Sequence, residues 1–139
     1  MPSSESPGPR TGTSEAVTRG IRVSVEAVYS PPHSRPSQQQ WFFVYTIRIA
    51  NEGDETVQLV SRHWTITDAV GSVEHVRGLG VVGEQPVLEP GEAFEYSSGC
   101  PLTTPSGDMA GTYQMVTGEG ESFDVQVARF QLEAPYTIH

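Results

Sequence analysis

The sequence predicts an all-β fold, an antiparallel two-sheet sandwich of about seven strands. Apolar and polar residues alternate in several segments, clusters of turn-forming residues separate these segments, and no long window shows a sustained helical period. Short strands separated by turns at regular spacing are typical of a sandwich and not of an alternating α/β fold.

The clearest alternation lies at residues 41–51, where all the large apolar side chains share one parity and therefore one face of the strand. These residues are Trp41, Phe43, Tyr45, Ile47 and Ile49. We expect Trp41 or Trp64, or both, in the core between the sheets. The other expected strands lie near residues 21–25, 57–68, 73–82, 94–96, 113–115 and 123–132.

The strand at 57–68 carries a charge on its apolar face. Val60, Trp64 and Ile66 have the same parity, and Arg62 shares it. Because an unpaired buried charge is costly, Arg62 must lie at the rim, pair with a carboxylate, or be turned outward by a bulge.

The chain divides into a tail and one domain. Residues 1–18 are rich in proline, glycine and small polar residues, with almost nothing to bury, so we expect a disordered N-terminal tail. Residues 19–139 should form the sandwich. Three prolines within residues 31–38 exclude a central strand there and predict an exposed loop.

Composition excludes several classes of partner. The formal net charge is −9, from 17 acidic and 8 basic residues. Such a chain lacks the positive field that neutralises phosphates, so neither nucleic acid nor an anionic membrane surface is an expected partner. No apolar run approaches the roughly 20 residues of a membrane span, and no signal-peptide pattern is present. We therefore expect a cytoplasmic protein without membrane insertion.

Gly78, Gly80 and Gly83 match the G-x-G-x-x-G pattern of dinucleotide sites. In that motif the last glycine opens a helix whose N-terminal amides hold the pyrophosphate. Pro86 and Pro90 prevent such a helix, and Glu84 would repel phosphate. We expect no tight nucleotide binding, and we interpret the glycines as permitting a bulge or a tight backbone approach.

Histidines on the expected hairpin raise the question of a metal site. A turn centred near residues 70–71 would place His75 opposite Ile66 and His63 opposite Gly78. Three residues of stagger correspond to about 10 Å, too far for two imidazoles to share one ion. The pattern therefore predicts no metal site and no cofactor.

The sequence also shows no arrangement of residues typical of a catalytic nucleophile and its base. Ser61 lies two residues before His63, but no acid that could orient the histidine is evident. Cys100 is the only cysteine, which excludes an intrachain disulfide, and it is interpreted as a small buried filler. Gly111-Thr112-Tyr113 resembles a tyrosine corner, in which the hydroxyl bonds to a preceding loop.

From Gly20 to His139 the chain resembles the ApaG family, also called CorD. The resemblance depends on a series of short segments that together cover all but the tail. They are residues 57–64, 66–68, 78–86, 90–92, 96–99, 104–107, 109–115, 130–132 and 138–139.

The resemblance implies a fibronectin type III-like, or immunoglobulin-like, sandwich in a stand-alone bacterial protein. It further implies a genetic link to cobalt resistance and magnesium efflux, with no assigned catalytic residues. Related domains in eukaryotic F-box proteins and in a DNA-polymerase-interacting protein look like protein-binding modules.

We therefore expect a non-enzymatic module that binds a protein partner and is associated with divalent-cation homeostasis. The alternative is a small-ligand or phosphate-binding protein that uses the loop Gly78–Gly83. A homo-oligomer is compatible with either. The candidate binding surface consists of Arg62, His63, Gly78, Gly80, Gly83, Glu84 and Gln85.

Overall fold

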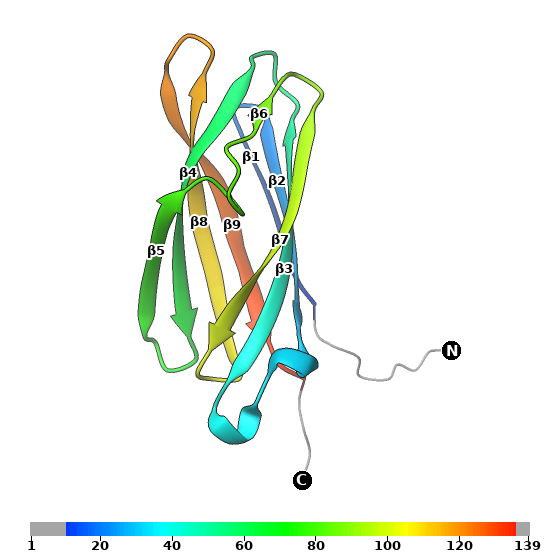
Figure 1. The fold of residues 1–139 in the computed structure, drawn as a ribbon, viewed down its shortest axis with the longest axis vertical. Helices are drawn as coiled ribbons and strands as arrows, with labels where there is room; N and C mark the ends of the chain where they lie inside the picture. The colour runs from blue at the N-terminus through cyan, green and yellow to red at the C-terminus, as the bar shows by residue number, and fades with distance from the viewer. Residues whose placement is uncertain (1–10, 136–139) are drawn as a thin grey trace, which may run out of the picture.

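The computed structural model describes residues 11–135, which contain nine strands and two short 3-10 helices (Figure 1). The loop expected at 31–38 is exposed but includes both 3-10 helices. No helix in the described range is long and apolar enough to cross a membrane. The elements are β1 (Thr11–Thr18), β2 (Ile21–Tyr29), η1 (Pro31–His33), η2 (Pro36–Gln38), β3 (Trp41–Asn51), β4 (Val57–Asp68), β5 (Val73–Leu79), β6 (Val87–Leu88), β7 (Ala93–Leu102), β8 (Ser106–Thr117) and β9 (Ser122–Glu133).

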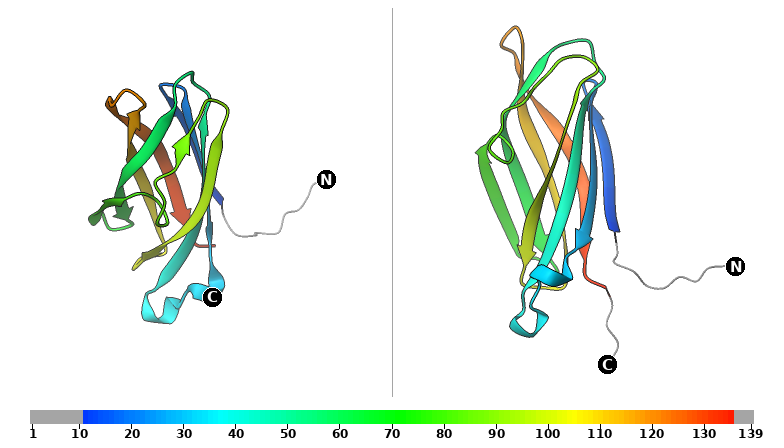
Figure 2. Two further views of the ribbon diagram at one scale, coloured as in Figure 1. Left: turned by 45° about the horizontal axis from the view of Figure 1, so that its top comes forward. Right: turned by 45° about the vertical axis from the view of Figure 1, so that its right-hand side comes forward.

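Two antiparallel sheets form the predicted sandwich (Figure 2). One sheet has the order β1-β2-β3-β7, and the other has the order β5-β4-β8-β9, with β6 pairing to the start of β4. The all-β prediction is confirmed. The two strands beyond the expected seven or so are β1 and the two-residue β6.

β1 corrects the predicted tail. Thr11–Thr18 pairs with β2 along its whole length, so the expectation of disorder through residue 18 is wrong for these residues. Residues 1–10 lie outside the described range. Ser14 Oγ donates to Ala128 O at 2.7 Å and Gln126 N donates to Thr18 Oγ1 at 3.1 Å, which joins β1 to β9 of the other sheet. Backbone pairing and these cross-sheet bonds stabilise a segment with few apolar side chains.

β4 contains a bulge that the alternation pattern did not predict. Its register with β8 shifts between Leu59 and Ser61. Leu59 is therefore buried before the bulge and Trp64 after it, although their parities differ. Val60, expected on the same face as Trp64, is only half-buried, because the bulge reverses the inward parity at that point.

The core lies between the two sheets. The expected apolar face of β3 is buried from Phe43 to Ile49, whereas Trp41 is only partly buried. Trp64 is 3% exposed and packs edge-on against Tyr45, Tyr113 and Phe130, with ring centroids 5.7, 6.1 and 6.2 Å away. The expectation that at least one tryptophan lies in the core is confirmed by Trp64.

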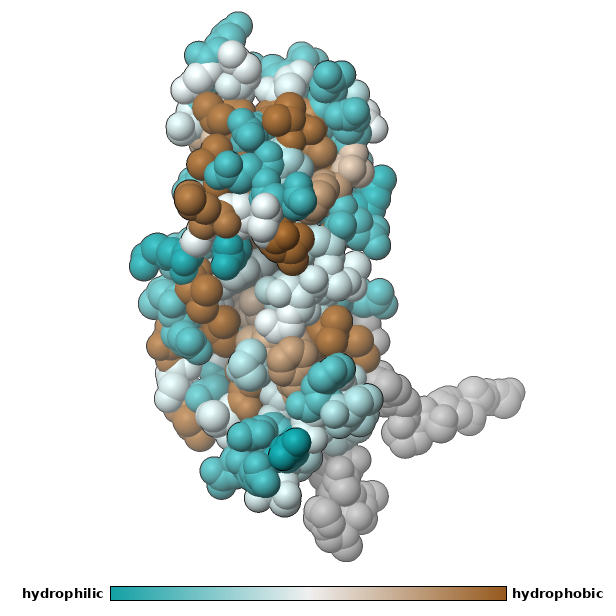
Figure 3. Space-filling view, viewed as in Figure 1, coloured by the Kyte–Doolittle hydropathy of each residue, from teal (hydrophilic) through white to brown (hydrophobic). Residues whose placement is uncertain are grey.

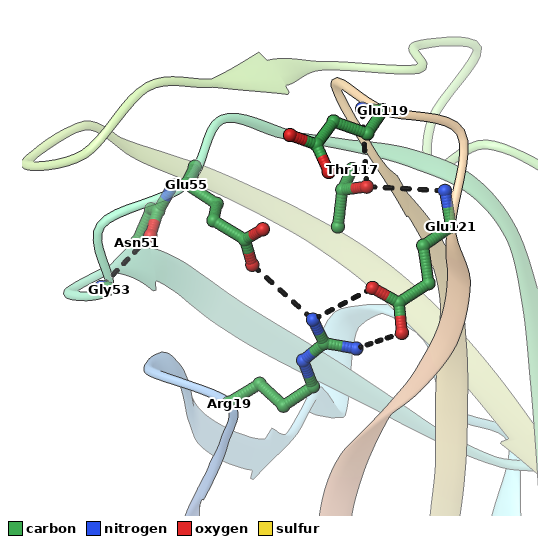
Figure 4. A network of polar contacts seen from close by, with 7 residues as sticks. All are labelled: Arg19, Asn51, Gly53, Glu55, Thr117, Glu119 and Glu121. Carbon is green, nitrogen blue, oxygen red and sulfur yellow. Dashed lines mark hydrogen bonds and ion pairs between the residues drawn. The ribbon is translucent and has the colours of Figure 1, made fainter.

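Arg19 closes one end of the sandwich by joining three turns (Figure 4). From the β1–β2 turn it contacts Glu55 of the β3–β4 turn at 3.3 Å and Glu121 of the β8–β9 turn at 3.1 Å. Buried Asn51 donates to Glu55 O and Leu88 O and accepts from Gly53 N. This end and the β1–β9 side are therefore held together by hydrogen bonds and ion pairs.

Candidate binding pocket

The side of the sandwich formed by β5 and β7 is open, because these two edge strands belong to different sheets and do not pair with each other. A pocket of about 440 Å³ lies between them and extends into the core. Figure 3 shows this face of the molecule hollowed midway along its length, with apolar surface flanking the hollow. The pocket is more enclosed than a hollow of similar volume on the outer face, which is lined by residues such as His63 and Arg77.

Cross-strand pairing explains which side chains reach the pocket. On β4, Arg62, Trp64 and Ile66 share the inward parity after the bulge, and their partners on β5 are Gly78, Val76 and Glu74. The remaining lining residues come from β3 and β7 of the facing sheet, from β8 of the same sheet as β4, and from the loop after β5. These include Tyr45, Tyr96, Ser98, Cys100, Met109, Val81, Val82 and Gly83.

Arg62 lies half-buried at one end of the pocket. Its Nη1 donates to the carbonyl oxygens of Leu79 at 3.1 Å and Gly80 at 2.9 Å. The guanidinium lies over Gly78, where an added Cβ would come within 2.8 Å of Nη1. No carboxylate within the described range forms an ion pair with it. Of the three options stated for Arg62, the structure adopts the rim position.

Buried hydroxyl groups lie near this charge. Burial raises the pKa of Tyr45, Tyr96 and Tyr113, and the Arg62 charge acts in the opposite direction on all three. Tyr96 and Tyr113 share a hydrogen bond of 2.6 Å across the two sheets. The tyrosine-corner interpretation is therefore wrong, because the Tyr113 hydroxyl meets a side chain of the facing sheet and not a preceding loop.

Cys100 and Ser61 lack the surroundings of a nucleophile. Cys100 is buried as expected, and burial, with a smaller effect of the Glu74 charge, raises the pKa of its thiol to about 12. A thiol with that pKa is not a thiolate at neutral pH. Ser61 Oγ donates to Gln114 Oε1 at 2.8 Å, so its partner is an amide and not a base.

The glycine loop is a tight turn whose amides are used within the protein. Gly80 has a φ of +62°, and a Cβ there would come within 2.2 Å of Glu84 O. Val81 and Glu84 exchange backbone hydrogen bonds of 2.8 Å in both directions, and Gly80 N donates to Val60 O. The strand β6 follows, not a helix. The interpretation of a tight backbone approach is confirmed for Gly80, whereas Gly83 has no atom close to the position of a Cβ and Gly78 lies against the Arg62 side chain.

The hairpin histidines are in contact, contrary to the predicted stagger. The register pairs Thr65 with His75 and His63 with Arg77, one residue away from the expected register. His63 and His75 are thus diagonal neighbours on the outer face, and His63 Nε2 lies 3.0 Å from His75 Nδ1. The expected separation of about 10 Å is wrong, because the turn centres on Val70 alone and diagonal side chains can reach each other.

The histidine pair is not part of a larger set of metal ligands within residues 11–135. In the portion of the chain that the structure describes, no group of three or more His, Cys, Asp or Glu residues is arranged to hold a metal ion. Partial burial lowers the pKa of His63, as do the Arg77 charge and His75, while Asp124 acts in the opposite direction.

The remaining candidate residues divide between two places. Arg62 and Gly83 line the pocket, while Arg62, His63 and Gly78 line a shallower hollow on the outer face. The Gln85 side chain donates to Val60 O at 2.8 Å and so connects the loop to β4. Glu84 is exposed. Sequence reasoning missed Glu74, Val76 and Ser98 as pocket residues. The sequence feature that indicated one wall of the pocket was the shared parity of Arg62, Trp64 and Ile66 on β4.

The fold and the pocket define a small antiparallel β-sandwich domain with a pocket between two free sheet edges. The family model described as DUF525, ApaG domain, matches residues 31–117. Protein ApaG of Rhodospirillum centenum is 58% identical over 120 residues, covering 86% of this chain and 92% of that protein. Protein ApaG of Methylorubrum populi is 55% identical over 122 residues, covering 88% and 94%.

A solved structure agrees with these sequence relatives. The crystal structure of an ApaA protein from Bordetella pertussis superimposes with a TM-score of 0.81 at 56% identity, covering 84% of this chain and 95% of that one. The chain belongs to the ApaG domain family, as its sequence segments indicated.

Proposed function

We propose that this chain is a non-enzymatic binding module that acts through protein contacts and is connected to divalent-cation homeostasis by its partner. The observation that carries the proposal is apolar surface beside two free sheet edges. Leu79 at the end of β5 is 74% exposed, and Val82 in the following loop is 55% exposed. Exposed apolar side chains grouped near a concave surface are typical of interaction sites.

Free strand edges supply the second part of this surface. β5 pairs with β4 on one side only, and β7 pairs with β3 on one side only. An extended segment of a partner can add to such an edge through backbone hydrogen bonds, with side chains in neighbouring pockets for specificity. In this proposal the binding surface includes the residues named from the sequence, Arg62, His63, Gly78, Gly80, Gly83, Glu84 and Gln85.

The surroundings of the potential nucleophiles support a role without catalysis. The Cys100 thiol is buried with a raised pKa, and Ser61 is bonded to an amide. The pair His63–His75 is too small a ligand set for a tight cobalt or magnesium site, since such sites need more ligands in fixed geometry. An effect on cations is therefore best assigned to the partner protein.

The alternative, a phosphate-binding role for the loop Gly78–Gly83, has less support. A phosphate cradle requires backbone N–H groups that point at the ligand. The N–H groups of Gly80, Val81 and Glu84 already donate to protein carbonyls.

The experiment is affinity capture with the full chain as bait, comparing wild type with a Leu79→Asp, Val82→Asp double variant. Val17→Asp is the control, because Val17 is 50% exposed on β1, on the other side of the sandwich. We expect a discrete partner, identified by mass spectrometry, to be captured by wild type and Val17→Asp and lost with the double variant. Capture that the double variant leaves unchanged, or no discrete partner at all, would contradict the proposal.

A further inference from the structure

Arg62 differs from Arg19 and Arg22 in having no carboxylate partner among the described residues. Arg19 pairs with Glu55 and Glu121, and Arg22 pairs with Glu15 and Glu52. Arg62 is half-buried on the core side of β4, and no described carboxylate pairs with it although the chain carries 17 acidic residues. A half-buried charge without a counter-ion is costly, so an anion from outside would be stabilised beside it.

The pocket next to Arg62 can take the apolar part of a small molecule. Trp64, Val76 and Met109 are apolar residues of its lining, and its volume of about 440 Å³ falls within the range of small-molecule sites. The Arg62 donors that are not bonded to Leu79 O and Gly80 O remain for a ligand. This combination of an apolar wall and one cation selects a molecule with an apolar body and an anionic group.

The other end of the pocket limits the ligand to one negative charge. Glu74 lines that end and pairs with Ile66, four residues along β4 from Arg62, a distance of about 13 Å. A second anionic group at that end would be repelled by the Glu74 carboxylate. Only one end of the pocket therefore favours an anion.

We propose that the pocket between β5 and β7 binds a small monoanionic amphiphile, with its carboxylate or sulfonate group on the Arg62 guanidinium and its apolar body against Trp64. The glycine loop contributes the wall formed by Val81 and Val82, and its amides do not take part. The site shares Arg62, Val82 and Gly83 with the proposed protein contact, but binding of the small molecule does not require that contact.

The test uses two fluorescent probes with the same ring system. 1-Anilinonaphthalene-8-sulfonate carries one sulfonate, and N-phenyl-1-naphthylamine carries none. The Trp41→Phe background leaves Trp64 as the only tryptophan, so its quenching reports occupancy of this pocket. We expect saturable binding at one site per chain, with the sulfonate probe bound roughly tenfold more tightly, because a hydrogen bond to a charged group contributes that much or more.

Substitutions in and near the pocket separate the effect of the Arg62 charge on probe affinity from the effect of the pocket's shape. Arg62→Met should weaken the sulfonate probe roughly tenfold and leave the neutral probe unchanged, and Arg62→Lys should retain part of the preference. Arg77→Met is the control, because Arg77 lies on the outer face and does not line this pocket. Val76→Phe should fill the pocket and weaken both probes. Circular dichroism and cooperative unfolding establish that each variant is folded.

Several results would overturn the inference. They are equal affinity of wild type for both probes, no quenching of Trp64, or loss of the sulfonate preference in Arg77→Met but not in Arg62→Met. If Arg62→Met does not fold, the comparison of the two probes on wild type and Val76→Phe still decides the matter. Displacement of the bound sulfonate probe by octanoate, but not by octanol, would extend the result to carboxylates.

Discussion

At the scale of single residues, two glycines of the same loop differ in the physical reason why each position requires glycine. Gly80 combines a φ of +62° with a backbone oxygen, that of Glu84, lying where a side chain would begin. Gly83 has a φ of +81°, but beyond its chain neighbours no atom lies within 4 Å of the position that a Cβ would take. Backbone conformation thus favours glycine at both of these positions, and close approach of backbone adds to it at Gly80 alone. The third glycine, Gly78, has a different cause, because the Arg62 guanidinium lies where its side chain would begin.

This difference gives a matched pair of substitutions. Gly83→Ala should lower the free energy of unfolding by about 1 kcal/mol, the cost of a left-handed conformation for a residue with a Cβ. Gly80→Ala should cost more, about 2–4 kcal/mol, because the loop must also move away from Glu84 O. Urea denaturation of the two variants measures the difference. If both variants lose the same free energy of unfolding, the loop moves away from Glu84 O at no cost, and the close approach at Gly80 does not contribute to stability.

At the scale of elements, the β4–β5 hairpin shows how much depends on one residue of register. The pairing of Thr65 with His75 places both hairpin histidines on the outer face, while Arg62, Trp64 and Ile66 face the pocket. A slip of β5 by one residue would place His75 opposite Ile66, on the pocket side, and would turn Glu74 and Val76 to the outer face. The bulge at Val60 and the turn centred on Val70 therefore decide together which side chains the pocket receives.

The hairpin should make stability depend on pH. The folded-state pKa of His63 is lowered by partial burial, by Arg77 and by His75, so below its ordinary value near 6.5 the unfolded state binds the proton more readily. The free energy of unfolding should then fall as the pH drops from 7.5 through 6.5 and below. His63→Gln should reduce this dependence. Urea denaturation at pH 7.5 and 5.5 tests this, and the same pH dependence in both proteins would exclude His63 as its source.

At the scale of the whole molecule, the two sides of the sandwich differ. On one side β1 joins the edges of both sheets, pairing with β2 and bonding through Ser14 and Thr18 to β9. On the other side β5 and β7 leave the pocket between them. The bonds of β1 to both sheets cover the closed side, and the open side is consequently the one available for binding.

Removal of β1 should therefore destabilise the entire domain. A chain that begins at residue 19 loses the eight-residue pairing with β2 and the cross-sheet bonds to β9. We expect the free energy of unfolding to fall by at least roughly 2 kcal/mol, since each backbone hydrogen bond contributes about 0.5–1.5 kcal/mol net. A chain that begins at residue 11, with β1 intact, is the control. If both truncated chains unfold at the same denaturant concentration, β1 does not support the sandwich.

The alternation of β3, the turn clusters and the burial of at least one tryptophan were readable from the sequence by itself, because they depend on the local period of a strand and on burial of large apolar side chains. Which tryptophan is fully buried, Trp64, was decided by the tertiary structure. The sequence also indicated the family. Only the tertiary structure decided the contact between His63 and His75, the strand at Thr11–Thr18 and the pocket beside Arg62. Each of these depends on register, on a bulge, or on pairing between segments far apart in the chain, and such long-range contacts leave no local periodic pattern.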